Sequence, residues 1–474
     1  MTSSTDNLLL VDAEVSGRRV DVRLGNGRVL EIAPHLTGRG ERILRCHGGA
    51  LIPGLHDHHL HLNALAAARR STFAGPPDVR SVHELERTLS RASNGDGWIR
   101  AVGYDDSTAG PLNRCVLDSL VPDRPVRVQH RSGALWILNS RALDLVSSCL
   151  DDSADVERDT AGRPNGRLWR YDRRLLPALP NEEPAQRNSL RSVTRQLFSL
   201  GVTGVTDATP DLDHRGITLL KETAPLGVHL LGAPDGLGLP RRMTLGPRKV
   251  LLRDHDLPSF DDLAGAIDPG SVGPGRRPVA VHCVTRESLL LTLAVLDEIG
   301  CVAGDRIEHA AVVPEGTEDE LARLGPTVVT QPDFLRTKGD GYLRDVDLED
   351  HEHLYRWAGL ARAGVRVVGS SDAPFGELDP WQVIRSASER ATATGRVIGR
   401  AERVDARTAL DGYLSGPENP GGRPRRVAAG APANLCLLTV PLAVAMANPS
   451  ADLVLLTILE GTPAAELTPD ARRW

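Results

Sequence analysis

The chain has little lysine, and several features of whole protein classes are missing from it. Only three of its 56 basic residues are lysines, namely Lys221, Lys249 and Lys338, and the others are arginines. No apolar run approaches the roughly 18 residues that a membrane span needs. The opening MTSSTDNLLLVD lacks the basic and apolar regions of a signal peptide. We therefore expect a cytoplasmic protein.

Cysteine pairs and a strong positive charge are also missing. The six cysteines are scattered and form no CxxC pair, which disfavours a disulfide framework or a zinc ribbon. A net charge of -6 argues against a nucleic-acid surface. With 474 residues, the chain can form one large α/β domain with appendages or two to three ordinary domains.

A histidine-rich stretch, PGLHDHHLHL, follows the apolar run 50–52. Side chains at positions i and i+2 of a strand point the same way, so His59 and His61 can bind one metal ion from one side. His56 and His58 would face the other side or lie in the turn. A surface histidine tract is the alternative, but the preceding apolar run and Pro-Gly turn favour a buried strand.

The middle of the chain alternates strand-like and helix-like segments, which predicts a parallel sheet with crossover helices. Eight strands are expected, the number that closes a (β/α)8 TIM-like barrel over residues 51–415. They are Leu51–Asp57, Val202–Asp207, Val228–Gly232, Lys249–Leu252, Val279–Cys283, Arg306–His309, Thr327–Thr330 and Val365–Gly369.

Three further features complete the predicted architecture. Short β-prone runs in residues 1–50 and 416–474, among them 427–442 and 451–461, predict a composite β-sandwich built from both termini, with a hairpin turn at 25–27. Residues 66–186 are too many for a simple crossover and predict an insertion over the barrel mouth. Helices are expected at 287–300, 317–325 and 379–395, and an irregular loop at 334–353.

Ionisable residues recur near the carboxyl ends of the predicted strands, where barrel active sites form. Each has a structural alternative: His282 and His309 could be core histidines, Asp372 a turn cap, and Lys249 an edge lysine with an apolar stem. Glu308 would point away from His309. All of these structural alternatives would have to be true at the same time on successive strands, which is less plausible than one shared metal site. The full set is His59, His61, Lys249, His282, His309 and Asp372.

Nearly the whole chain resembles the metal-dependent amidohydrolase superfamily, in the branch that includes N-substituted formamide deformylases. The resemblance rests on an ordered set of motifs: PGLHDHHLHL, GWIRAVGYDDS, LWILNSRAL, GRPNGRL, GVTGVTDA, AVHCVTRE, DRIEHAAVV, VVTQP and GSSDAPFGELDP.

This resemblance implies two divalent ions, expected to be zinc, held by the six residues above. It implies that Lys249 is carbamylated by carbon dioxide to N6-carboxylysine, which an always-charged arginine cannot form. It also implies a hydrolytic reaction in which metal-activated hydroxide attacks a carbonyl. Asp372 would be the catalytic residue, shuttling a proton to the leaving nitrogen.

The substrate contacts are less well defined. Relatives often have a histidine where this chain has Ala134. From position alone, we expect Tyr104, Asp105, Trp136 and Gln331 to bind substrate, with Arg170 and Asp333 nearby.

The sequence thus predicts hydrolysis of a C–N bond in an amide, a formamide or a cyclic amide, other than an ordinary peptide bond. The substrate would be a small molecule or a modified peptide, without nucleic acid or membrane, and the chain could form a homo-oligomer. The alternatives are a mononuclear zinc heterocycle deaminase with the lysine spare, a hydrolase of a peptidic amide in natural-product maturation, and a catalytically silent barrel scaffold.

Overall fold

The computed structural model describes residues 7–76, 78–92, 97–180, 183–254, 256–270 and 275–467. The chain divides into two compact units, one of residues 1–62 and 191–474 and the other of residues 63–190. The predicted terminal sandwich and the predicted barrel both fall in the first unit, and the predicted insertion lies within the second. Residues 1–6 and 468–474 of the predicted sandwich lie outside the described residues.

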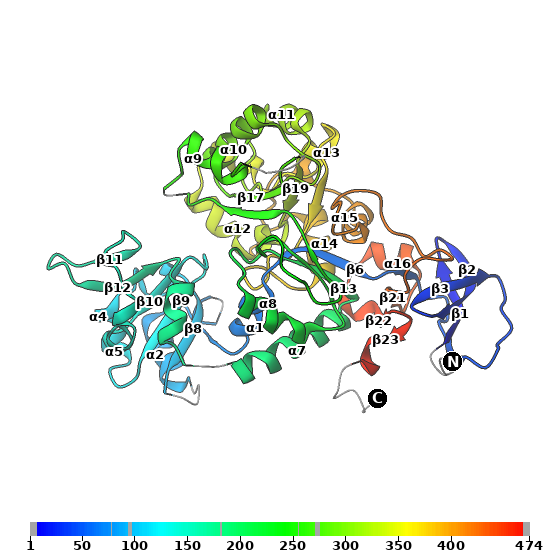
Figure 1. Cartoon of the computed structure of the whole chain (residues 1–474), viewed down its shortest axis with the longest axis horizontal. Coiled ribbons are helices and arrows are strands. Elements are labelled where there is room, and N and C mark those ends of the chain that lie inside the picture. The colour runs from blue at the N-terminus through cyan, green and yellow to red at the C-terminus, as the bar shows by residue number, and fades with distance from the viewer. Residues whose placement is uncertain are drawn as a thin grey trace. The chain divides into compact units, whose positions relative to one another are not determined.

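Two four-stranded sheets contain the terminal segments (Figure 1). The first has the order β3-β2-β1-β4 and the second β23-β22-β21-β5. Apolar residues of both ends, among them Leu10, Leu24, Leu435 and Ile458, share one buried cluster. The bounds are β1 Leu8–Val15, β2 Arg18–Gly25, β3 Arg28–Ala33, β4 Arg42–Arg45, β5 Leu51–Pro53, β21 Leu435–Leu438, β22 Val454–Leu459 and β23 Thr462–Pro463.

The predicted terminal strands are shorter than expected. In 427–442 only β21 is a strand, and helix α16 (Leu442–Ala447) follows Pro441. In 451–461 a short 3-10 turn, η7 (Ala451–Leu453), precedes β22. The hairpin at 25–27 is confirmed, because β2 and β3 pair antiparallel up to Gly25 and Arg28. That both ends form one sandwich stays a prediction.

The central strands form two parallel sheets, ordered β15-β14-β13-β6 and β16-β17-β18-β19-β20. Most of these strands are buried along their length, as parallel strands covered by helices are, whereas the two strands between residues 243 and 251 are mostly half-buried or exposed. The bounds are β6 Leu55–Leu60, β13 Val202–Asp207, β14 Gly227–Leu230, β15 Met243–Leu245, β16 Arg248–Leu251, β17 Val279–Cys283, β18 Arg306–His309, β19 Thr327–Thr330 and β20 Val367–Gly369.

Backbone hydrogen bonds join these two sheets in two places. The Lys249 amide donates to the Leu231 carbonyl over 3.1 Å, and the Asp372 amide donates to the His59 carbonyl over 2.8 Å. The fourth predicted strand, Lys249–Leu252, is present as β16, one residue earlier, and pairs with β17; a further short strand that was not predicted, β15, precedes it and pairs with β14. The carboxyl ends of strands from both sheets thereby meet in one region.

The predicted first strand, Leu51–Asp57, is two strands. β5 pairs with β21 in the terminal sheet, whereas β6 pairs with β13 in the central sheet. Gly54 separates them, and a Cβ there would lie 2.2 Å from the methyl carbon of Thr203. Only glycine allows the chain to pass this close while it changes sheets.

Helices cover the central strands, and one predicted loop is a helix. Residues 334–353 contain α12 (Asp333–Asp345) and the 3-10 segment η5 (Leu348–His353), so the loop prediction was wrong. Gly339 of α12 allows close packing, because a Cβ there would lie 2.7 Å from the Thr392 methyl carbon. The other helices are α7 Glu183–Ser199, α8 His214–Leu220, α9 Phe260–Ile267, α10 Arg286–Ile299, α11 Thr317–Leu324, α13 Ala358–Arg362, α14 Pro380–Glu389 and α15 Ala406–Leu414.

The helix predicted at 379–395 ends earlier than expected. α14 stops at Glu389 because Arg390 adopts a left-handed conformation with a φ of 50° and caps it. The helices expected at 287–300 and 317–325 are confirmed as α10 and α11, each to within one residue.

The second unit is built on a six-stranded sheet of order β11-β12-β10-β9-β8-β7. Its buried apolar residues form two clusters of their own, around Leu85 and around Trp136. The bounds are α1 Leu62–Ala68, β7 Thr72–Phe73, α2 Val82–Arg91, β8 Ile99–Tyr104, α3 Asp106–Ala109, α4 Arg114–Leu120, β9 Val126–His130, β10 Leu135–Leu138, α5 Ser140–Leu145, β11 Val156–Arg158, β12 Pro164–Trp169 and α6 Asp172–Leu175.

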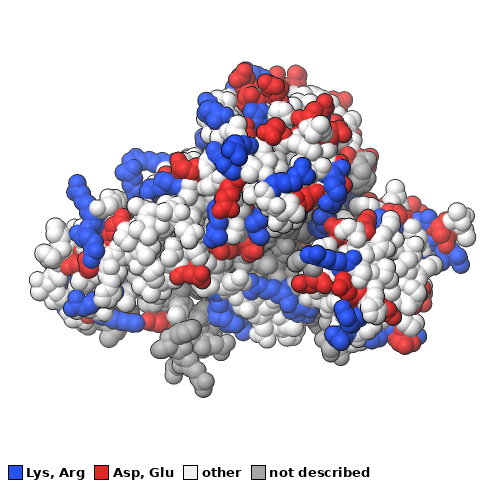
Figure 2. All heavy atoms as spheres, turned by 180° about the vertical axis from the view of Figure 1, so that it is seen from behind, with Lys and Arg blue, Asp and Glu red and all other residues white. Residues whose placement is uncertain are grey.

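Surface charges of both signs are interspersed on the face shown in Figure 2. Many pair locally, as Arg323 does with Asp297 at 2.8 Å. Within the described residues, no helix has both the length and the apolar character to cross a bilayer.

Candidate metal centre

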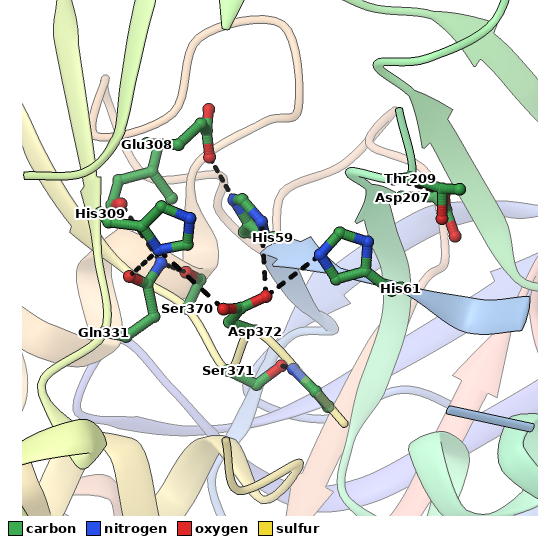
Figure 3. A network of polar contacts seen from close by, with 12 residues as sticks. His59, His61, Asp207, Thr209, Glu308, His309, Gln331, Ser370, Ser371 and Asp372 are labelled. Atoms are coloured by element: carbon green, nitrogen blue, oxygen red, sulfur yellow. Dashed lines mark hydrogen bonds and ion pairs between the residues drawn. The ribbon is translucent and has the colours of Figure 1, made fainter. Parts of the chain in front are cut away.

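A buried group of imidazoles and one carboxylate lies where strands of the two central sheets end (Figure 3). The His59 Nε2 is 3.5 Å and the His61 Nε2 is 3.2 Å from Oδ1 of Asp372. One ligand atom from each of these residues lies within 4.8 Å of the others. His59 is fully buried and Asp372 almost so. This trio has the residue types, spacing and burial of a divalent-metal site.

Three more of the predicted residues adjoin the trio. His309 places its Nδ1 3.9 Å from Oδ2 of Asp372, and its ring centroid is 5.0 Å from that of His59. The His282 ring centroid is 4.5 Å from that of His309. The Lys249 amine is buried, and its charge acts on the pKa of both His59 and His309. We call these six residues the six-residue cluster.

Neighbouring oxygen atoms set which nitrogen of two imidazoles carries the hydrogen. His59 donates from Nδ1 to Glu308, because a carboxylate can only accept. His309 donates from Nδ1 to Oε1 of Gln331 over 2.7 Å. The Gln331 amide nitrogen donates to Val329 and Ser370, which fixes the amide orientation. Both imidazoles therefore keep the Nε2 lone pair for a metal ion.

The backbone is strained at two residues of the cluster. His309 has a φ of 71° and Asp372 a φ of 51°, and Ala310 is also left-handed at 45°. Such conformations cost non-glycine residues about 1–2 kcal/mol each. The left-handed residue at 309 breaks the alternation of strand side chains, so Glu308 and His309 both reach His59. Strain that clusters at buried polar groups is typical of functional sites.

The pKa values of the cluster follow from burial and neighbouring charge. Burial, helped by the Lys249 charge, lowers the pKa of His59 to about 3. Burial also lowers the pKa of the Lys249 amine. For Asp372, burial alone would raise the pKa, but the imidazoles of His61, His59 and His309 outweigh it and hold the pKa well below its usual range. These shifts favour a neutral His59 and an ionised Asp372, the forms that bind metals.

Several buried polar atoms of the cluster have no hydrogen-bond partner within the described residues. They are Nε2 of His59, Oδ1 of Asp372 and Nζ of Lys249. A buried polar group left unpaired costs about 1–3 kcal/mol, so three of them in one place indicate a missing partner. A divalent ion fits Nε2 of His59 and Oδ1 of Asp372, since imidazole nitrogen and carboxylate oxygen are zinc ligands.

Among the predicted substrate contacts, Gln331 adjoins the cluster through its hydrogen bond with His309. Tyr104, Asp105 and Trp136 lie in the second unit and make their contacts there. The Tyr104 hydroxyl donates to the Gly110 carbonyl, and Nε1 of Trp136 donates to Asp172 over 2.6 Å. Their contact with a substrate stays a prediction.

The contacts of Asp105, Asp333 and Arg170 with a substrate also stay predictions, and each of these residues has local contacts within the chain. Asp105 caps α3 by accepting from the Ser107 amide and pairs with Arg131. Asp333 pairs with Arg336 and accepts from Ser386 over 2.7 Å. Arg170 donates its backbone amide to the carbonyl of Ala134, the residue in the family's histidine position.

Glu308 was misjudged from the sequence. It was expected to point away from His309, yet it accepts from the neighbouring His59 in the same group. The available signal was the pair Arg306 and Glu308, two charged residues two positions apart on a buried strand. Such residues share a face, and buried charges are paired.

The sequence profile of the amidohydrolase family matches residues 44–301 and 273–465. The chain belongs to this family. An N-substituted formamide deformylase from Arthrobacter pascens is 26% identical over 92% of this chain and 94% of its own length. The two ranges matched by the family profile contain all six positions of the six-residue cluster.

Solved structures share the fold of this amidohydrolase. An uncharacterized metal-dependent hydrolase from Pyrococcus furiosus has a TM-score of 0.65 at 20% identity and covers 94% of this chain and 100% of its own. Atrazine chlorohydrolase from Arthrobacter aurescens, complexed with zinc, has a TM-score of 0.52 at 14% identity and covers 96% and 94%. The fold is that of metal-dependent hydrolases, an α/β TIM-like barrel. Closure of the ring in this chain stays a prediction, since its strands form two sheets.

Proposed function

We propose that this amidohydrolase cleaves the C–N bond of an amide, a formamide or a cyclic amide with the help of a divalent metal. The observation that carries the proposal is the trio of His59, His61 and Asp372 beside His309. Within the described residues, Nε2 of His59 and Oδ1 of Asp372 are buried without a hydrogen-bond partner. The formamide deformylase relative supports the bond type, because its name describes removal of a formyl group from nitrogen.

In this proposal the six-residue cluster holds the metal, with zinc as the expected ion. When bound, the metal supplies a water of lowered pKa and polarises the substrate carbonyl. Asp372, an ionised carboxylate that faces the imidazoles, takes the proton of the attacking water and returns it to the leaving nitrogen. Amines leave poorly without that proton. The low pKa of His59 keeps this imidazole neutral and able to bind metal at neutral pH.

Lys249 is proposed to carry the carbamate. Its amine is buried and has a lowered pKa, so the uncharged form is more accessible than for a lysine in water. The neutral amine adds to carbon dioxide and releases one proton, which leaves an anionic carbamate with two oxygens for two ions. An arginine cannot do this, since its guanidinium stays charged.

A mononuclear heterocycle deaminase is the second candidate. It is favoured by one observation: His59, His61 and Asp372 already form a compact set of ligand atoms without the lysine. In that case one zinc ion is bound and Lys249 is spare.

Metal content separates the two candidates. We expect two zinc ions per chain in the wild type after loading with zinc and bicarbonate, and at most one in Lys249→Ala, as measured by elemental analysis. Lys221→Ala is the matched control, since Lys221 lies exposed in the short turn that follows α8. One ion in both the wild type and Lys249→Ala would instead establish the mononuclear site.

The reaction itself is tested by a substrate screen. The zinc-loaded chain is offered N-formyl, N-acyl, cyclic-imide, peptide-amide and aminoheterocycle compounds, and release of amine, acid or ammonia is measured. We expect turnover of one of the first three classes. Turnover of aminoheterocycles alone would overturn the proposal in favour of the deaminase.

A further inference from the structure

Glu308 is a buried carboxylate that the proposed reaction does not use. It lies on β18, its side chain is 0% exposed, and it accepts from Nδ1 of His59 (Figure 3). His59 comes from β6, a strand of the other central sheet. A carboxylate in this position has to be compensated, because an unpaired buried charge costs several kcal/mol.

Arg306 provides the compensation from the same strand. Its Nε donates to Oε1 of Glu308 over 2.7 Å, and its Nη2 donates to Oε2 over 3.1 Å. The same Nη2 donates to the His58 carbonyl over 2.7 Å. Arg306 is itself 1% exposed, so the guanidinium has little freedom. Both oxygens of Glu308 are therefore held in fixed directions, one of them toward His59.

The hydrogen bond to Glu308 fixes the orientation of the His59 imidazole. The Nδ1–H is bound to Glu308, so the lone pair lies on Nε2. This Nε2 faces Oδ1 of Asp372 at 3.5 Å and has no hydrogen-bond partner among the described residues. A carboxylate that receives the second nitrogen of a metal-binding histidine sets its orientation and raises its basicity.

We propose that Glu308, clamped by Arg306, is a positioning residue that sets the tautomer and direction of His59 for metal binding. The inference rests on the proposed metal-dependent function. It adds Glu308 and Arg306 to the six-residue cluster, because Arg306 contacts Glu308 and Glu308 contacts His59. It also explains why two opposite charges are buried on the central strand RIEH.

The competing explanation is an ion pair that only stabilises β18. Asp305 provides a matched control for it, because this buried aspartate pairs with Arg276 and accepts from the amides of Val279 and Val302. None of these contacts involves the six-residue cluster. Asp305→Asn therefore removes a buried ion pair next to the same strand without touching His59.

The experiment measures zinc affinity by competition with a chromophoric chelator, together with the thermal midpoint of the zinc-free protein. Glu308→Ala is expected to weaken zinc binding by about 10–100-fold. Glu308→Gln, which keeps an acceptor without the charge, is expected to fall between Glu308→Ala and the wild type. Asp305→Asn should lower the thermal midpoint and leave zinc affinity within twofold of the wild type.

A double variant separates positioning from folding. In Arg306→Met with Glu308→Ala no buried guanidinium is left unpaired, so the thermal midpoint should recover relative to Glu308→Ala while zinc affinity stays weak. Zinc affinity within twofold of the wild type in Glu308→Ala, or its recovery in the double variant, would overturn the positioning role alone. A wild-type chain without zinc affinity would overturn the proposed function and this inference together.

Discussion

At the scale of single residues, the candidate site depends on one carboxylate among imidazoles. Asp372 is buried, its backbone is left-handed, and its amide donates to the His59 carbonyl. These features hold the carboxylate between His59, His61 and His309 rather than toward solvent. They also keep it ionised, because the imidazoles outweigh the effect of burial on its pKa.

Asp372→Asn should therefore lose catalysis without losing the fold. An amide cannot accept the proton of the attacking water, so we expect the rate constant of hydrolysis to fall by about 10²–10⁴-fold. The measurement is kcat on the substrate found by the screen. Asp319→Asn, at an exposed position of α11, is the control and should keep wild-type kcat. A kcat within tenfold of the wild type in Asp372→Asn would exclude the proton-shuttle role.

The six-residue cluster could be named from the sequence because its residue types are restrictive. Few chemistries need histidines, one of only three lysines and an aspartate at the ends of successive strands. Glu308 could not be placed in the same way. Strand alternation puts it opposite His309, and only the left-handed backbone at His309 brings both to His59.

At the scale of elements, Glu402 links two segments beside the central sheet. It ends the 3-10 turn η6 (Arg400–Glu402) and accepts from the backbone amides of Trp357 and Gly359 over 3.1 and 2.6 Å, at the start of α13. It also accepts from Nε of Arg356 over 2.9 Å. Burial alone would raise the pKa of Glu402, but these contacts outweigh it and lower the pKa. The ionised carboxylate thus holds the first turn of α13.

This cap predicts a pH-dependent loss of stability in Glu402→Gln. A carboxyl with a lowered folded-state pKa stabilises the fold above its unfolded pKa of about 4.5, and this stabilisation is lost as the pH falls through the folded-state value. We expect Glu402→Gln to lower the free energy of unfolding by about 1–3 kcal/mol at pH 7, and by less at pH 4. Urea unfolding at both pH values measures it.

The control for this prediction is Glu298→Gln, at an exposed position of α10. It should change the free energy of unfolding little at either pH. An equal loss at pH 7 and pH 4 in Glu402→Gln would mean that the charge of Glu402 contributes nothing.

The elements themselves were largely readable from periodicity and end signals, with instructive exceptions. The strands β13, β17, β18 and β19 match their predicted bounds, since each is a short buried run with clear ends. Helix α12 was missed because its glycines are typical of loops. Gly339 is required instead by the close approach of Thr392, a residue that is distant in the sequence.

At the scale of the whole molecule, metal binding should be visible as stability. A ligand that binds only the folded chain stabilises it by about 2.7 kcal/mol when its free concentration is 100 times its Kd. We therefore expect zinc to raise the thermal midpoint of the wild type and a chelator to reverse the increase. The zinc-dependent increase should disappear in His61→Ala. It should persist in His83→Ala, because the His83 side chain is 82% exposed. An equal increase in both variants would place the zinc elsewhere.

The sequence by itself determined the residue types of the site, the parallel α/β class and most strand positions. These depend on local patterns, namely apolar runs, turn residues and the few side chains that can bind a metal. Only the tertiary structure decided that Gly54 separates two sheets, that α12 is a helix and that Arg306 and Glu308 hold His59. Each of these depends on an atom brought close by a distant part of the chain, and such proximity leaves no periodic trace in the sequence.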